Sequence, residues 1–185
     1  MPETPRIIAI TNQKGGVGKT TTAINLGASL AQLGERVLLV DMDPQGNAST
    51  GLGIGQAERD VTSYDVLMGH SGAKDAILPT STKRLSVIPA TPDLSSVDIE
   101  LAGARDRITR LRNALRDGDI GNQDIVLIDC PPSLNMLTVN ALVAADGVLV
   151  PLQCEFFALE GITQLLRTVS EIRQSSNKNL ITQGI

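Results

Sequence analysis

The chain has 185 residues, of which 42% are hydrophobic and 2% aromatic, and it carries a formal net charge of −4 at pH 7. These values exclude a disordered chain and a molecule that binds nucleic acid through an overall basic charge, so any DNA contact needs a local basic surface. Two cysteines without the spacing of a disulfide framework or metal site, no signal sequence and no apolar run of about 18 residues together predict a cytoplasmic protein.

Short aliphatic runs alternate along the chain with segments of helical period. The runs are rich in Ile, Leu and Val, as buried parallel strands are, and the segments between them repeat apolar residues with the period of a helix. In chain order, the sequence first predicts a strand at 6–11, a helix at 19–33, a strand at 36–41, a Gly-rich loop at 44–60, a short helix at 63–68 and a strand at 85–89. It then predicts a helix in one or two pieces at 93–117, a strand at 124–129, a helix at 134–145, a strand at 147–152, an amphipathic helix at 158–173 and the opening of a further strand at 180–185.

This alternation of strands and helices predicts the α/β class, with a doubly wound and mostly parallel sheet. Such sheets bind ligands in the loops beyond the carboxyl ends of their strands. Three loops of this kind are candidates for a functional site, and they follow Thr11, Val40 and Ile128.

The loop after the first predicted strand has the composition of a phosphate-binding turn. Its glycines let the backbone turn tightly and direct successive N–H groups inward, and the following helix adds its positive N-terminus. Lys19 supplies a positive charge for the β- and γ-phosphates, and the Thr20 hydroxyl is a ligand for Mg²⁺. The residues expected to bind the nucleotide are Lys14, Gly15, Gly16, Val17, Gly18, Lys19, Thr20 and Thr21.

The common pattern G-x-x-x-x-G-K-[ST] requires glycine at position 13, where this chain has Gln13. The run from Gly15 to Thr20, preceded by Lys14, is instead the deviant form of the Walker A loop. A Gly-rich turn that only joins a strand to a helix is the alternative, but two lysines, three glycines and two threonines between strand and helix favour the phosphate loop.

Acidic residues end two further strands on the same side of the predicted sheet. Asp41 and Asp43 close the second strand, and Asp129 closes the fourth. Carboxylates there can hold Mg²⁺ through water or orient a water for attack on the γ-phosphate, so Thr20, Asp43 and Asp129 are the expected metal-site residues. A helix cap or solvated loop at Asp129, and a turn-forming Asp-Pro at Asp43, remain the simpler alternatives.

These motifs resemble the ParA/Soj group of partition ATPases within the wider ParA–MinD family. The resemblance rests on QKGGVGKTT at 13–21, VLLVDMDPQGNAS at 37–49, IDCPPSLNMLTVNAL at 128–142 and LQCEFFALEG at 152–161. It implies a P-loop NTPase fold of the deviant Walker (SIMIBI) type, formed by residues 1–185 as a single ATPase domain. Members of this group continue well beyond position 185, so the chain is expected to lack a C-terminal part that carries adenine-side contacts and much of the DNA-binding surface.

The resemblance also implies functional roles. ATP and Mg²⁺ are the expected cofactors, and a weak conversion of ATP and water to ADP and phosphate is the expected reaction. Lys14, Lys19 and Asp43 are the expected catalytic residues, with Lys14 reaching the nucleotide of the other subunit in an ATP-bound homodimer. The dimer is expected to bind DNA non-specifically at the nucleoid, and a ParB-like partner to stimulate hydrolysis; no membrane partner is expected.

Two alternatives remain at the level of sequence. One is a membrane-associated positioning ATPase like MinD, although no C-terminal amphipathic helix of that kind is visible. The other is an inactive nucleotide-binding fragment. An arginine-rich stretch at 105–116 is read as a solvated helix face, with DNA or partner binding as a minority interpretation.

Overall fold

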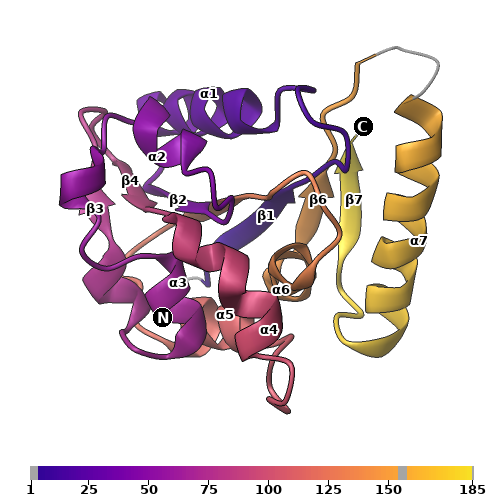
Figure 1. Cartoon of the computed structure of the whole chain (residues 1–185). Coiled ribbons are helices and arrows are strands. Elements are labelled where there is room, and N and C mark those ends of the chain that lie inside the picture. Colours follow the sequence, from indigo (N-terminus) through magenta and orange to yellow (C-terminus); the bar gives the residue numbers. More distant parts are fainter. Residues whose placement is uncertain (1–3, 154–157, 185) are drawn as a thin grey trace.

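The computed structural model describes residues 4–153 and 158–184, and its centre is one seven-stranded sheet (Figure 1). All neighbouring strands are parallel except the pair β3–β4, which is antiparallel. The strand order across the sheet is β3 (Leu78–Pro79), β4 (Leu85–Ile88), β2 (Val37–Asp41), β5 (Ile125–Asp129), β1 (Arg6–Ile10), β6 (Gly147–Leu149) and β7 (Ile181–Gly184).

The two faces of the sheet carry separate hydrophobic clusters because successive side chains of a strand point to opposite faces. In β5, Val126 and Ile128 belong to one cluster, whereas Leu127 belongs to the other. Aliphatic residues of β1 and β2 divide between the same two clusters. The central strands are therefore buried on both sides, as a parallel sheet covered by helices requires.

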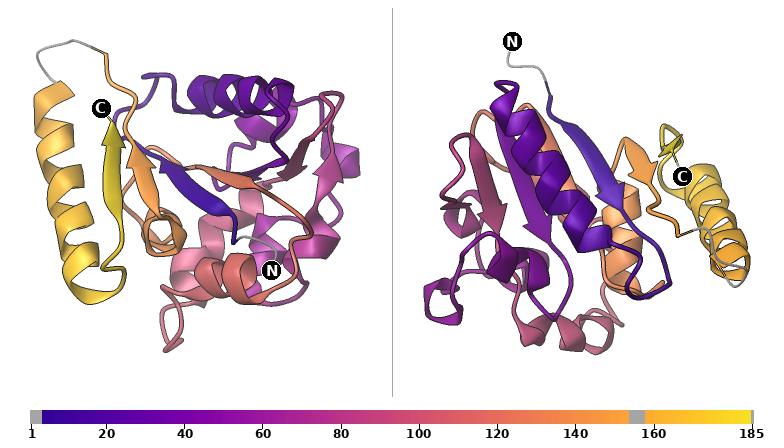
Figure 2. Two further views of the ribbon diagram at one scale, coloured as in Figure 1. Left: turned by 180° about the vertical axis from the view of Figure 1, so that it is seen from behind. Right: turned by 90° about the horizontal axis from the view of Figure 1, so that it is seen from above.

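Helices cover both faces (Figure 1). The helix α1 (Lys19–Gln32) lies across one face together with α2 (Asn47–Gly51), and the view from above in Figure 2 shows α1 along that face. The other helices pack on the opposite face: α3 (Ser63–Met68), α4 (Val97–Glu100), α5 (Arg110–Arg112), α6 (Met136–Ala144) and α7 (Ala158–Ser175). The predicted α/β, doubly wound, mostly parallel fold is thereby confirmed.

Three segments differ from the sequence prediction. The expected loop at 44–60 contains α2 and a 3-10 helix, η1 (Gln56–Glu58). The short strand β3 was not expected. The expected helix at 93–117 is a chain of short pieces, with η3 (Pro92–Ser96) before α4, turns up to α5 and a π-helical turn, η4 (Asn113–Asp117); η2 (Ala73–Ala76) is a further 3-10 turn.

The interruption of the expected helix at 93–117 is caused by a contact with a distant residue. The side chain of Asn140, on α6, accepts a hydrogen bond from the Leu111 N–H at 3.2 Å and donates one to the Arg107 carbonyl at 2.7 Å. A side chain that takes up backbone groups in this way replaces the bonds of a continuous helix. Most large apolar residues of this segment are buried as its helical period predicts, but they lie on separate short turns instead of one helix.

None of the helices in the described part of the chain is both long enough and apolar enough to cross a bilayer.

Candidate functional site

A cavity of about 360 Å³ opens beside the first turn of α1, where β2 and β5 end. Its position agrees with the rule that open α/β sheets bind ligands beyond the carboxyl ends of their strands. The register of the sheet brings these ends together, since Asp129 of β5 pairs with Asp41 of β2 and with Ile10 of β1. The cavity is lined by Gly15, Gly16, Gly18, Lys19, Thr20, Thr21, Asp43, Gln45, Asn47 and Pro132.

The glycines of the predicted phosphate loop shape one wall of this cavity. Gly16 and Gly18 have positive φ angles of 75° and 89°, which L-residues with side chains rarely adopt. A Cβ placed on Gly15, Gly16 or Gly18 would meet no atom within 4 Å, so the glycines face open space. Gly18 is also the N-cap of α1, and the first N–H groups of a helix have no acceptor within it. The loop thus has the room and the donors that a phosphate group needs.

Lys19 lies at the floor of the cavity, with 7% of its surface exposed. Its Nζ donates a 3.0 Å hydrogen bond to the carbonyl of Lys14, which holds the ammonium group across the loop. Burial lowers the pKa of Lys19, while the carboxylates of Asp129 and Asp43 act in the opposite direction. Burying a charged group is costly unless it is hydrogen-bonded, and the bond to the Lys14 carbonyl offsets part of this cost for the ammonium group.

Thr20, which lines the cavity, contacts Asp129 at the end of β5. The Thr20 hydroxyl donates a 2.7 Å hydrogen bond to Asp129 Oδ2, whereas Asp129 Oδ1 is buried without a hydrogen-bond partner among the described residues. Burial raises the pKa of Asp129 from 3.8 to about 7. An orphaned carboxylate oxygen beside a threonine hydroxyl fits the outer coordination of a hydrated Mg²⁺, an ion that retains several waters and uses few protein ligands.

The two aspartates at the end of β2 have different surroundings. Asp41 is fully buried, and its Oδ2 accepts hydrogen bonds from Ser49 N at 2.8 Å and Ser49 Oγ at 2.6 Å. Asp43 lines the cavity, where its Oδ1 accepts a 2.9 Å bond from Gln45 N. Burial raises the pKa of Asp41. Of the pair, only Asp43 is placed to face a ligand in this cavity, and Asp41 instead anchors the loop.

Two of the expected nucleotide-binding residues do not line the cavity. Lys14 is not among the lining residues, and its backbone N–H donates a 3.0 Å hydrogen bond to Asn12 Oδ1. The side chain of Val17 is buried. Two residues that the sequence prediction omitted support the loop: Asn12, whose Nδ2 also donates to the Pro151 carbonyl at 2.8 Å, and Gln153, whose Nε2 donates to the Gly16 carbonyl at 3.2 Å.

Within residues 4–153 and 158–184, no group of three or more His, Cys, Asp or Glu side chains forms a cage for a metal ion. Mg²⁺ retains several waters and takes few protein ligands, so a magnesium site does not require such a cage. Cys130 is a buried free thiol. Cys154 and the other residues at 154–157, part of the fourth family motif, lie outside the described residues.

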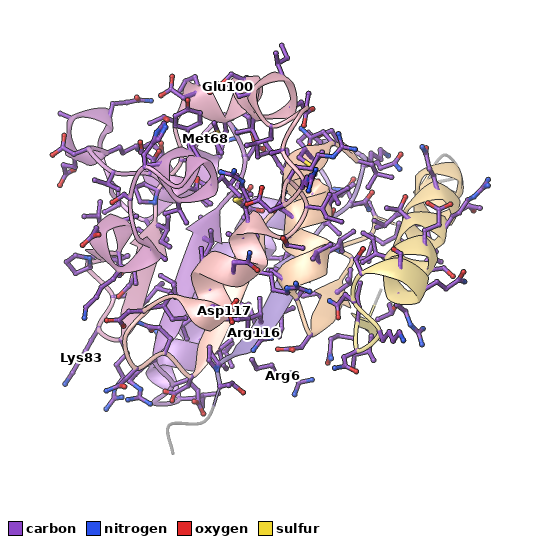
Figure 3. All side chains as sticks on the ribbon, turned by 90° about the horizontal axis from the view of Figure 1, so that it is seen from below. Arg6, Met68, Lys83, Glu100, Arg116 and Asp117 are labelled. Carbon is purple, nitrogen blue, oxygen red and sulfur yellow. The ribbon has the colours of Figure 1, made fainter. Side chains whose placement is uncertain are left out.

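The arginine-rich stretch forms the expected solvated face only in part: Arg105 and Arg107 are exposed, whereas Arg110 and Arg116 bind other segments. Arg110 donates a 3.1 Å hydrogen bond to the Leu67 carbonyl at the end of α3, and Arg116 donates one of 2.8 Å to the Pro5 carbonyl. Figure 3 shows Arg116 on the underside of the molecule near Arg6, where β1 begins. Because these guanidinium groups connect segments of the chain, their main contacts are internal.

Comparison with known proteins gives close matches over the same residues. A family model described as an AAA domain matches residues 5–182. The chromosome partitioning protein ParA of Caulobacter vibrioides is 62% identical over 181 residues, which are 97% of this chain and 68% of that protein. The sporulation initiation inhibitor protein Soj of Bacillus subtilis is 52% identical over 180 residues, which are 97% of this chain and 71% of Soj.

A solved structure from Mycobacterium smegmatis is also similar. It is described as cobyrinic acid a,c-diamide synthase with bound ATP analogue and magnesium, and it superposes with a TM-score of 0.91 at 43% identity, covering 96% of this chain and 72% of that one. The same protein has also been solved with ADP and magnesium. The nucleotide and the metal that the sequence predicts are thus both found in solved structures of this fold.

Proposed function

The chain belongs to the ParA/Soj family of partition ATPases, and we propose that it is an ATP-binding and ATP-hydrolysing switch in the segregation of a chromosome or plasmid. One observation carries the proposal most directly. A glycine loop with open space, a buried lysine, a threonine hydroxyl and Asp43 line a single cavity at the ends of β2 and β5. Asp129 does not line this cavity, but it is joined to it through its hydrogen bond with the Thr20 hydroxyl.

In this proposal, the backbone N–H groups of Gly15–Thr21 and the ammonium of Lys19 bind the triphosphate. Thr20, Asp43 and Asp129 are the proposed metal-site residues, with Mg²⁺ neutralising phosphate charge when it is bound. Asp43 follows the end of β2 and lines the cavity, and we assign it the orientation of the attacking water. A positioned carboxylate of this kind assists proton transfer from water.

The finer steps of the switch are also proposals. Lys14 is assigned to the γ-phosphate of a second subunit, so that ATP would stabilise a homodimer and hydrolysis would withdraw that stabilisation. The dimer would bind DNA without reading its sequence, at the nucleoid, and a ParB-like partner would stimulate turnover. Since the net charge of the chain is −4 and two of the arginines at 105–116 have internal contacts, DNA binding would depend on a local basic surface elsewhere.

Partition is favoured over the amide-forming activity in the description of the Mycobacterium smegmatis structure. Identity is 62% to the Caulobacter vibrioides partition protein and 43% to the Mycobacterium smegmatis protein. A diamide synthase would also need sites for a large acid substrate and an amine donor. The cavity described above is lined by groups suited to phosphate and metal.

Calorimetric titration of the protein with Mg·ATP tests the first part of the proposal. We expect Lys19→Ala to abolish binding, since it removes the only ammonium group among the cavity-lining residues. Lys83→Ala is the matched control, because Lys83 is an exposed lysine outside the cavity. Binding that survives Lys19→Ala would remove the phosphate-loop assignment, and phosphate release at background in the wild type would favour the inactive-fragment alternative.

Cosedimentation tests the second part. With ATP present, we expect the protein to sediment with DNA of arbitrary sequence and not with anionic liposomes. ADP in place of ATP is the control, because the proposed DNA-binding state depends on the γ-phosphate. Sedimentation with liposomes alone would support a positioning ATPase of the MinD type.

A further inference from the structure

Arg59 is a buried guanidinium group at the back of the loop that carries Asp43. Only 6% of its surface is exposed. Its Nη1 donates to the Ala90 carbonyl at 2.9 Å, and its Nη2 donates to Thr50 Oγ1 at 2.8 Å and to the Ile54 carbonyl at 2.9 Å. In the described part of the chain, no carboxylate forms an ion pair with it.

A buried charge without a counterion is costly, and it is tolerated only where hydrogen bonds take the place of water. Arg59 has such bonds on both terminal nitrogens, and its Nε is buried without a partner among the described residues. Hydrogen bonds from a charged donor are stronger and shorter than neutral ones. The planar, forked donor group can hold several acceptors in one fixed geometry, which a lysine cannot.

The acceptors come from different segments. Thr50 belongs to α2, Ile54 follows α2, and Ala90 follows β4. Arg59 therefore ties α2 and the turn after it to the end of β4. Without this group, the three acceptors would have no common donor to hold the segments together.

The same group also lies against the backbone of the Asp43 loop. Gly46 has a φ of 62°, and a Cβ at this position would overlap Nη1 of Arg59. Gly46 is the N-cap of α2, and its N–H donates a 2.9 Å hydrogen bond to the Asp43 carbonyl. A direct path of contacts thus runs from the guanidinium of Arg59 through Gly46 to Asp43.

A second set of hydrogen bonds also connects Ala90 with the Asp43 loop. Ser49 of α2 donates through both N–H and Oγ to Asp41 Oδ2, and Ser49 Oγ accepts a 3.0 Å bond from Ala90 N. Asp41 Oδ1 in turn accepts a 3.2 Å bond from Asp43 N. Ala90, whose carbonyl accepts a hydrogen bond from Arg59, is therefore also linked through Ser49 and Asp41 to the backbone of Asp43.

We propose that Arg59 is a positioning residue for Asp43: it clamps the loop at 43–46 and α2 against the end of β4, so that the Asp43 carboxylate is held toward the phosphate loop. This inference rests on the proposed function, because it assigns Arg59 an effect on ATP hydrolysis. Arg59 does not line the cavity, and its hydrogen bonds go to Ala90, Thr50 and Ile54, which lie outside the phosphate loop.

Hydrogen exchange followed by mass spectrometry tests the clamp without nucleotide. In Arg59→Met, which keeps a long side chain without donors, we expect amide exchange at residues 45–52 to rise by on the order of tenfold or more, with exchange in β1 and α1 unchanged. Arg59→Lys, which keeps the charge but not the fork, is expected to recover part of the protection. Arg105→Met, a change at an exposed arginine, is the control and should leave both regions unchanged.

Binding and turnover then separate positioning from general weakening. We expect Arg59→Met to bind Mg·ATP with the wild-type Kd, since the phosphate loop is untouched, and to lose on the order of 10- to 100-fold in single-turnover hydrolysis, as supporting residues do. Gly46→Ala should lower turnover through the same clamp. Its further effect in the Arg59→Met background should be smaller than in the wild type, because the guanidinium that it would displace is absent.

A uniform rise of exchange over the whole chain, or equal losses in binding and turnover, would show that Arg59 is only a stabilising residue and overturn the proposal. Strictly additive effects of Gly46→Ala and Arg59→Met would also overturn it. Failure of the proposed function is distinguishable, since a wild type that binds no Mg·ATP would refute that function while the exchange result at 45–52 still decides whether the clamp exists.

Discussion

The Thr20 hydroxyl and the Asp129 carboxylate are joined by a 2.7 Å hydrogen bond that links the first turn of α1 to the end of β5. The other oxygen of this carboxylate, Oδ1, is buried without a hydrogen-bond partner among the described residues. The proposed metal site is thus preformed on one side, with a hydroxyl and a carboxylate already in contact.

Replacing Thr20 tests this contact. Thr20→Val keeps the shape of the side chain but leaves the buried carboxyl group of Asp129 without its donor, so we expect a loss of about 1–3 kcal/mol in unfolding free energy and a weaker dependence of ATP binding on Mg²⁺. Thr20→Ser retains the hydroxyl and should restore both. Urea unfolding and calorimetry at several magnesium concentrations measure the two effects. Equal behaviour of the valine and serine variants would show that the hydroxyl has no such role.

The glycines with positive φ allow backbone strain to be separated from ligand binding. Gly18 and Gly53 have φ angles of 89° and 86°, and a Cβ on either would meet no atom within 4 Å. We therefore expect Gly18→Ala and Gly53→Ala to cost similar stability, about 1–2 kcal/mol each from the left-handed conformation. Only Gly18 lines the cavity, so only Gly18→Ala should weaken ATP binding. Similar loss of binding in both variants would indicate a global effect.

Asp43 and Asp60 form a second matched pair of changes. Asp43→Ala should leave ATP binding intact and slow turnover by on the order of 100-fold or more, as expected for loss of a group that assists proton transfer. Asp60→Ala removes an exposed carboxylate of the same chain region and should leave turnover unchanged. Single-turnover phosphate release measures both, and normal turnover in Asp43→Ala would withdraw the hydrolytic role from this residue.

The burial of Asp129 predicts a pH dependence of stability in the nucleotide-free protein. Burial raises the pKa of Asp129 from 3.8 to about 7, so the folded state holds the proton more tightly than the unfolded state. The contribution of this group to stability is then fully present below pH 3.8 and is lost as the pH rises through about 7.

Asp129→Asn removes this titration. We expect the unfolding free energy of the wild type to fall more steeply between pH 5 and pH 8 than that of Asp129→Asn, because the amide stays neutral throughout. Urea unfolding at the two pH values provides the measurement. Identical slopes in the two proteins would mean that Asp129 is not the group whose charge the fold opposes.

The glycine-rich turn after the first strand and the positions of the central strands along the chain were predictable from sequence, because both depend on local patterns. Residues from Gly15 to Thr20 carry their chemistry in adjacent positions, and aliphatic runs mark each central strand. The different surroundings of Asp41 and Asp43 were not predictable. They depend on Ser49, which returns to Asp41 through α2, and no local rule places that contact.

The errors in secondary structure have the same origin. The segment at 44–60 contains several glycines, which disfavour helix by about 1 kcal/mol each, yet α2 forms there because Asp41 and Arg59 bind its backbone and side chains from outside. Conversely, the apolar period at 93–117 indicated a helix, and Asn140 interrupts it. In both cases a contact between distant residues overrides local propensity.

The alternation of side chains along β5 determines which mutations of this strand the fold can tolerate. Val126 and Ile128 fill the layer beneath α3–α7, whereas Leu127 fills the layer beneath α1. One extra residue inside β5 would exchange the two layers and turn Asp129 away from Thr20 in a single step. Replacing a single side chain in β5 should therefore disturb the structure far less than changing the length of the strand. A natural variant with an insertion in β5 should lose both the fold and the site.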